Sequence, residues 1–274
     1  MEFALSTYLF VEERLSTFIL DQILGAGFRQ IEIFAARQHF DYREANQVRD
    51  TAQWFKDHGL QLHSLHAPLF PDTDWGRSGG QPVSITYTER GHRINSMDEI
   101  KRAIDVAERV PFKYLIVHMG LADEEYDLRK FDAAFTSIEH LRIFAKERGA
   151  QVLLENIPNE LSTAERLLSF IHYTRMDNLK LCFDVGHAHM LGNALEAFEA
   201  LKDRIASTHV HDNNKEKDDH LVPFEGEILW PQLVRGFRAG EGQFPVLFEV
   251  RNEGPEKPVL PRLSEAMKRM EEMK

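Results

Sequence analysis

The sequence has one cysteine, Cys182, among its 274 residues. A single thiol forms no internal disulfide, which excludes a disulfide-stabilised secreted scaffold. No apolar run approaches the roughly 20 residues of a membrane-spanning helix. The first residues lack the basic start, apolar block and small-residue cleavage site of a secretory signal. We therefore expect a cytoplasmic protein without a membrane partner.

Positive charge is also scarce. The 33 lysine and arginine residues stand against 44 aspartate and glutamate residues, which gives a net charge of −11 at pH 7. A surface that repels phosphates must overcome its own field before it binds nucleic acid. The charge therefore predicts a small-molecule substrate and no nucleic-acid partner.

Linkers rich in proline or serine, low-complexity segments and close internal repeats are absent too, so we expect one domain over residues 1–274. Apolar residues make up 43% of the chain and charged residues 28%. This balance is typical of a globular protein and not of a disordered one.

An extended apolar run and an amphipathic helix alternate eight times along the chain. The expected strands lie near residues 2–8, 28–34, 60–66, 113–118, 151–156, 179–184, 205–211 and 244–250. Apolar residues at intervals of three and four predict helices over 43–58, 128–148 and 259–272, with helix ends marked by Gly25, Gly59 and Gly149. Eight strand–helix units in about 250 residues suit a closed parallel barrel. The sequence therefore predicts an α/β fold, a single (β/α)8 TIM barrel.

Four of the expected strands end in an acidic residue or a histidine. The runs QVLLE, KLCFD, IASTH and PVLFE close on Glu155, Asp184, His209 and Glu249. Residues that end successive parallel strands of one barrel converge on one mouth, where carboxylates and an imidazole bind a divalent cation at neutral pH. A helix N-cap explains one such residue but not four. We therefore expect a shared metal site and a metal-dependent enzyme.

Further potential ligands are expected at the same mouth. They end other strands or lie in the loops that follow strands: His66, His118, His187, Asp218 and His220. With the first four they make nine, enough for more than one metal ion or for contacts to a substrate. The remaining histidines are interpreted as structural or surface residues: His39, His58, His63, His92, His140, His172, His189 and His211.

The connections after His66 and His209 are much longer than an ordinary strand-to-helix loop. In a barrel such loops lie over the active mouth, so they are expected to form the walls of the substrate site. Aromatic side chains are available there as apolar surface: Phe70, Trp75, Phe224 and Trp230. Among them Trp75 is predicted to contact the substrate. The alternative for residues 72–86 is a disordered excursion, because the segment holds three glycines.

Seven short motifs at these strand ends and in these loops resemble, in order, those of the xylose-isomerase-like barrel superfamily. They are HAPLF at 66–70, VHMG at 117–120, LLENIPN at 153–159, FDVGHAHM at 183–190, HVHDNN at 209–214, DDHLVPFEGEILW at 218–230 and FEV at 248–250. The superfamily includes sugar and sugar-phosphate isomerases and epimerases, inosose dehydratases and zinc-dependent apurinic-site endonucleases. The resemblance covers nearly the whole chain.

What the resemblance implies differs between branches. In isomerases and epimerases the residues that match Glu155, Asp184, His209 and Glu249 hold one Mn, Co, Mg or similar ion, and the two glutamates exchange protons with the substrate. In the endonucleases the residues that match all nine positions hold three zinc ions. Either branch implies a divalent metal cofactor, whose identity stays open.

Several features favour the isomerase branch. Asp72 and Asp74 would face phosphates, and residues 213–220 carry as much negative as positive charge, so no stripe for counterion release is visible. A glycine-rich phosphate cradle is absent after the last two strands, which favours an unphosphorylated sugar or polyol. A noncatalytic sugar-binding barrel remains a third alternative.

The expected chemistry is proton transfer in carbohydrate metabolism. A metal on neighbouring oxygens of a hydroxy-carbonyl sugar stabilises an enediolate, while Glu155 and Glu249 remove and return the proton. The sequence does not distinguish between isomerisation, epimerisation and loss of water. His187 is expected to hold a substrate hydroxyl. Glu32, in the run QIEIF, is expected to orient His66 or contact the substrate, or else to be a buried charge paired with a neighbouring ligand.

Overall fold

The computed structural model describes residues 1–240 and 242–273. Its eight strands are parallel and lie in the order β7-β6-β5-β4-β3-β2-β1-β8. Their bounds are β1 Phe3–Ser6, β2 Gln30–Phe34, β3 Leu62–His66, β4 Phe112–His118, β5 Gln151–Glu155, β6 Lys180–Asp184, β7 Ile205–His209 and β8 Val246–Phe248. A parallel bridge between Val210 and Phe248 joins the two ends of the sheet. The sheet is thus a nearly closed barrel.

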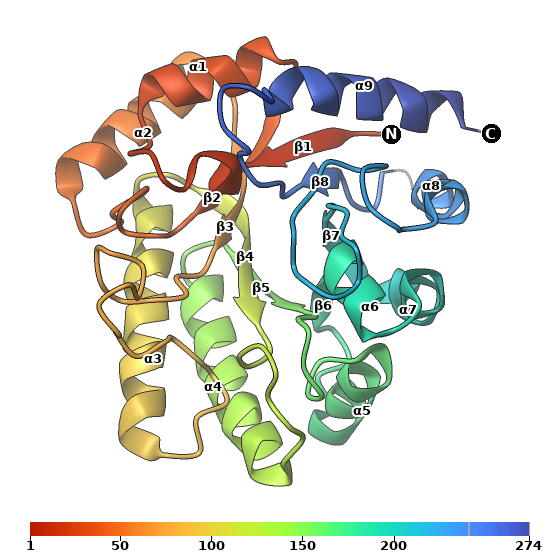
Figure 1. Ribbon diagram of the computed structural model, residues 1–274. Coiled ribbons are helices and arrows are strands. Elements are labelled where there is room, and N and C mark those ends of the chain that lie inside the picture. Colours follow the sequence, from red (N-terminus) through yellow and green to blue (C-terminus); the bar gives the residue numbers. More distant parts are fainter. Residues whose placement is uncertain (241, 274) are drawn as a thin grey trace.

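Helices surround the strands (Figure 1). They are α1 Thr17–Gly25, α2 Ala45–Asp57, α3 Arg90–Ile104, α4 Leu128–Lys146, α5 Ala164–Thr174, α6 Val185–Leu191, α7 Ala194–Leu201, α8 Trp230–Ala239 and α9 Val259–Glu272. Short 3-10 turns lie at η1 Thr7–Phe10, η2 Asp105–Glu108 and η3 Lys202–Arg204. The prediction of a (β/α)8 barrel is confirmed. No helix of the described chain is long and apolar enough to span a membrane.

Alternate residues of β4 face two different cores. On β4, Leu115 and Val117 belong to the large cluster that also holds residues of the helices. Tyr114 and Ile116 belong to a small cluster with Leu153, Cys182 and Ala206, which come from other strands of the barrel. Since side chains two apart point the same way, His118, Glu155 and Asp184 continue the inner rows toward the carboxyl end.

The long loop after β3 is packed, so the alternative of a disordered excursion at 72–86 is wrong. Val83 and Ile85 are buried in the main core. Asp72 Oδ1 accepts hydrogen bonds from the backbone nitrogens of Asp74 and Gly76. Asp72 therefore organises the loop from within, and Gly76 takes a left-handed turn with φ of 75° that suits glycine.

Candidate metal centre

The residues that end β5, β6 and β7 and the one that follows β8 meet at the carboxyl end of the barrel. They are Glu155, Asp184, His209 and Glu249, and one potential ligand atom of each lies within 4.8 Å of the others. His209 Nδ1 lies 3.0 Å from Glu155 Oε1, 3.6 Å from Glu249 Oε2 and 3.9 Å from Asp184 Oδ2. All four side chains are buried.

The ends of β5 and β6 are tied together beside this group. Asn156 Nδ2 donates to the Asp184 carbonyl at 2.8 Å, and the Asp184 backbone nitrogen donates to Asn156 Oδ1 at 2.9 Å. Asp184 is also the N-cap of α6, because its Oδ1 accepts from the His187 backbone nitrogen at 2.6 Å. Asp184 is therefore both a helix cap and a member of the four-residue group.

Glu32 sets the orientation of His209. Its fully buried carboxylate accepts from His209 Nε2 at 3.1 Å and from Ser64 Oγ at 2.7 Å. In the neutral ring, which is the form that binds a cation, Nε2 then carries the hydrogen and the lone pair of Nδ1 faces the acidic residues. The residue that Glu32 orients is therefore His209 and not His66, and the predicted substrate contact of Glu32 stays a prediction. The alternative reading, a buried charge paired with a ligand, describes it.

When no ion is bound, protonated imidazoles compensate the negative charge of the carboxylates. Burial opposes ionisation of Glu155, but His209 and His118 hold the pKa of its carboxyl well below the usual range. Burial also opposes protonation of His209, yet the acidic groups around it, Glu155 and Glu249 among them, raise its pKa well above the ordinary value. The group therefore needs positive charge to be stable in the buried mouth.

The donor set suits a divalent cation. Glu249 Oε1 is buried and has no hydrogen-bond partner among the described residues, and Glu155 Oε2 is approached by the His66 and His118 rings at 3.3 Å and 3.4 Å. Buried carboxylate oxygens are rarely left unpaired, whereas cation ligands keep such lone pairs free. Three carboxylates and one imidazole with a free Nδ1 lone pair would hold Mn, Co, Mg or Zn.

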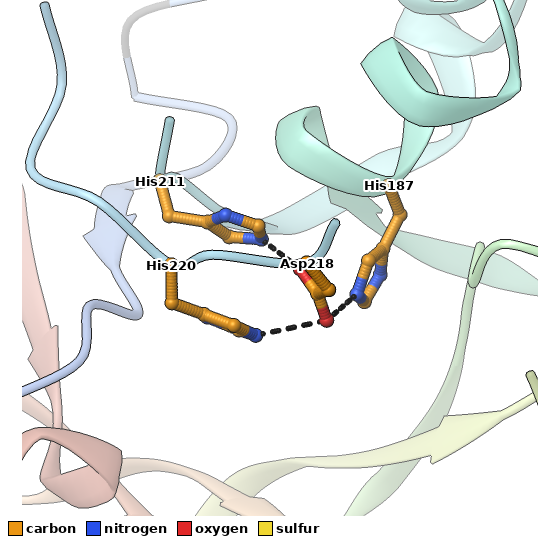
Figure 2. Close-up of side chains that lie close together, drawn as sticks. All are labelled: His187, His211, Asp218 and His220. Carbon is orange, nitrogen blue, oxygen red and sulfur yellow. Dashed lines mark hydrogen bonds and ion pairs between the residues drawn. The ribbon is translucent and has the colours of Figure 1, made fainter. Parts of the chain in front are cut away.

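A second group surrounds Asp218 in the loop after β7. Figure 2 shows the rings of His187, His211 and His220 around its carboxylate. Asp218 Oδ2 lies 3.1 Å from Nε2 of both His187 and His220. The Nδ1 atoms of these two rings lie 2.9 Å and 2.7 Å from the carbonyls of Asn156 and Glu249, to which they donate as N–H groups. In the neutral rings both Nε2 lone pairs then face the carboxylate, an arrangement that protonation or a cation makes favourable.

Protonation is favoured there in the metal-free protein. Burial opposes it, but Asp218 raises the pKa of His220 to about 9. Burial likewise opposes it at His187, where Asp184 and Asp218 raise the pKa well above the ordinary value. His187 thus faces Asp218, and a substrate hydroxyl would have to compete with that contact.

His66 and His118 form a third group with Glu155. Their Nε2 atoms lie 3.2 Å apart, and 3.3 Å and 3.4 Å from Glu155 Oε2. His66 Nδ1 lies 2.8 Å from the Ala67 carbonyl, to which it donates, so in the neutral ring Nε2 carries no hydrogen. All nine residues predicted as ligands from the sequence are therefore brought together at one mouth.

Aromatic rings line one side of this mouth. Phe34 stacks on His66 with centroids 4.4 Å apart, and Tyr8 lies over His220 at 4.7 Å. Trp75 packs on both Tyr8 and Phe34. Tyr8 and Trp75 also border a cavity of about 370 Å³ that Arg251 helps to line. Trp75 is therefore placed at the rim of the mouth, where a substrate contact was predicted for it.

Trp230 does not line the mouth, and the prediction that it forms a substrate wall is wrong. It is 2% exposed at the start of α8, and its Nε1 donates to Asp212 Oδ2 at 2.7 Å. Phe224 packs against Trp230 and under the Arg269 guanidinium. Both rings serve packing because the loop after β7 folds back onto the helices.

The sequence predicted no role in the site for three residues that the structure places there: Tyr8, His211 and Asp212. His211, interpreted from the sequence as a structural or surface residue, is wholly buried and belongs to the Asp218 group. A signal was present: His211 follows His209 by two positions and points to the same side of the strand.

The chain matches the family model of the xylose isomerase-like TIM barrel over residues 20–273. It is 28% identical to the uncharacterized protein y4fM of Sinorhizobium fredii over 84% of this chain and 79% of that protein. It is 22% identical to fructoselysine 3-epimerase of Shigella flexneri over 76% and 75% of the two chains. This protein belongs to the xylose isomerase-like TIM barrel family.

Solved structures agree on the fold. A D-tagatose 3-epimerase-like protein superimposes with a TM-score of 0.78 at 23% identity, over 99% of this chain and 97% of that one. The IOLI protein with a bound zinc atom also has a TM-score of 0.78, at 17% identity, over 99% and 96%. The resemblance inferred from the motifs is therefore confirmed at the level of family and fold.

Proposed function

We propose that this protein is a divalent-cation-dependent isomerase or epimerase that acts on an unphosphorylated sugar or polyol. One observation carries the proposal: Glu155 and Glu249 flank His209 Nδ1, and Glu249 keeps a buried oxygen without a hydrogen-bond partner among the described residues. The epimerase relative and the zinc atom in the IOLI protein support the same chemistry.

The two glutamates divide the proton transfer. A cation in the four-residue group would stabilise the negative charge that develops on a substrate oxygen as the neighbouring C–H proton leaves. One of Glu155 and Glu249 accepts that proton. The other returns a proton to the adjacent carbon in isomerisation, or to the opposite face of the same carbon in epimerisation.

Proton exchange with solvent tests the reaction directly. Metal-loaded protein in deuterated water is incubated with free ketoses, aldoses and inososes, and C–H exchange and products are followed by NMR. We expect exchange at one carbon of at least one substrate. Release of water from the substrate would identify a dehydratase instead.

Substitution of Glu249 tests its role. Glu249→Gln removes the proton acceptor while conserving shape, so turnover should fall about 100-fold or more. Metal content is measured for each sample. The matched control is Glu256→Gln, an exposed glutamate of the following loop. Unchanged turnover in metal-loaded Glu249→Gln would contradict the acid–base role.

The nine converging ligands favour apurinic-site endonuclease as a second candidate. The net charge of −11 opposes it, because phosphate contacts supply most nonspecific affinity for DNA. Asp72 accepts hydrogen bonds from backbone nitrogens of its own loop, which leave its negative charge in place. We expect no incision of abasic DNA by zinc-loaded protein at physiological salt. Incision that disappears in His66→Ala and Glu249→Gln would replace the isomerase proposal.

A further inference from the structure

His211 lies between the four-residue group and the Asp218 group. We infer that His211 is a positioning residue of the metal centre, which holds the Asp184 carboxylate in place by donating its Nε2 hydrogen to Oδ2. This inference rests on the cation site of the proposed function, but it does not depend on which reaction is catalysed.

The hydrogen bond and the tautomer agree. His211 Nε2 lies 3.2 Å from Asp184 Oδ2, and both side chains are fully buried. Asp184 Oδ2 is an acceptor for Nε2, whereas no described residue near Nδ1 could accept a hydrogen, so the hydrogen of the neutral ring belongs on Nε2. His211 Nδ1 is buried and has no partner among the described residues, as expected for the ring nitrogen without a hydrogen.

Asp184 is thereby held at both oxygens. Oδ1 accepts from the His187 backbone nitrogen at 2.6 Å, and Oδ2 accepts from His211. With both anchored, the carboxylate cannot rotate about its last bond, and its remaining lone pairs keep their direction. A cation at the four-residue group then meets a preorganised ligand.

The ring of His211 is confined by contacts that leave it one position. A Cβ atom on Gly186 would lie 2.0 Å from its Cε1, so only glycine leaves space for the ring. On the other side the His220 ring is stacked with centroids 3.9 Å apart. The backbone is held as well, since the nitrogens of Val210 and Asp212 donate to the carbonyls of Leu247 and Leu221.

Direct coordination of an ion by His211 agrees less well with the geometry. Its Nε2 lies 3.7 Å from Asp218 Oδ1, farther than from Asp184 Oδ2. If Nε2 were a ligand, Nδ1 would carry the hydrogen, and a buried N–H would be left without an acceptor. The positioning role leaves no buried donor unpaired.

A set of four variants tests the role by cation affinity, measured through competition with a chelator. His211→Ala should weaken binding about 10- to 100-fold, and His211→Gln, whose amide donates from a similar position, should recover most of the loss. Gly186→Ala keeps every donor atom but displaces the ring, so it should also weaken binding. In a His211→Ala background Gly186→Ala should have no further effect, because the ring it displaces is absent.

Folding and stoichiometry are controlled in the same samples. Circular dichroism and the melting temperature of the metal-free variants show whether each one folds, and elemental analysis counts the bound ions. The number of ions should be the same in the wild type and in His211→Gln. Loss of one ion in both His211 variants would make His211 a ligand and overturn the positioning role.

The outcomes separate this inference from the proposed function. Equal affinity in wild type and His211→Ala, or additive losses in the double variant, would overturn the inference alone. A wild-type protein that binds cations but exchanges no substrate proton would overturn the proposed reaction alone. A wild-type protein that binds no divalent cation would overturn both.

Discussion

The buried pair of Glu32 and His209 decides which imidazole nitrogen faces the cation position. Glu32 accepts the Nε2 hydrogen, so Nδ1, which lies 3.0 Å from Glu155 Oε1, is the nitrogen left to bind a cation when it loses its proton. A carboxylate behind a ligating histidine fixes the ring and increases the basicity of the free nitrogen.

At the residue scale we predict that Glu32→Gln weakens cation binding about 10- to 100-fold, because a neutral amide polarises the imidazole less than a carboxylate does. Isothermal titration measures the affinity. Glu2→Gln is the control: Glu2 lies at the opposite end of the barrel, where it accepts from Gln30 at the start of β2. Equal affinity in both variants would show that Glu32 has no influence on His209.

At the scale of elements, Asp212 organises the loop between β7 and α8. Its buried carboxylate accepts four hydrogen bonds, from the backbone nitrogens of Asn213, Phe224 and Ile228 and from Trp230 Nε1. Gly226 passes so close that a Cβ would lie 2.5 Å from Asp212 Oδ1. The loop that presents Asp218 and His220 is thus wound around one side chain.

Asp212→Ala leaves several buried donors unpaired, so the free energy of unfolding should fall by on the order of 3 kcal/mol. Hydrogen exchange should be accelerated first at residues of this loop. Denaturant unfolding and exchange mass spectrometry measure the two effects. Asp219→Ala, in the same loop but with only long contacts to Asn214, should change both little. Similar losses in the two variants would contradict the organising role of Asp212.

At the scale of the whole molecule, His39 makes stability depend on pH. It is fully buried, and its Nδ1 donates to the Glu13 carbonyl at 2.5 Å. Burial lowers its pKa to about 4, although the backbone contacts oppose the shift. An unfolded chain with the ordinary pKa of 6.5 binds the proton more readily than the folded protein does.

The contribution of His39 is therefore complete above pH 6.5 and is lost as the pH falls to about 4. The loss is on the order of 3 kcal/mol. His39→Asn keeps a donor for the carbonyl but does not titrate, so unfolding measured between pH 7 and pH 4 should show a smaller slope. His140→Asn, an exposed histidine of α4, is the control. An unchanged slope in His39→Asn would contradict the prediction.

Local patterns in the sequence determined the barrel and the ligand residues. Alternation of apolar runs with amphipathic helices predicts parallel strands, and such strands must send their last inward side chains to one mouth. Glu155, Asp184 and His209 could be placed together in this way because position and direction on a strand follow from its period of two. At either end, the β-strand bounds in the structure differ from the predicted ones by a few residues at most.

Only the tertiary structure decided which side chains support these ligands. Glu32 and His209 are 177 positions apart in the chain, and His211, which follows β7, contacts Asp184 at the end of the neighbouring strand β6. Trp230 is a large aromatic residue that was expected to line the substrate site, but the loop after β7 directs its side chain into the core. A period predicts the direction of a side chain. Which residue that side chain contacts depends on interatomic distances, on the tautomer and on the space that neighbours such as Gly186 leave. These are set only once the barrel has closed.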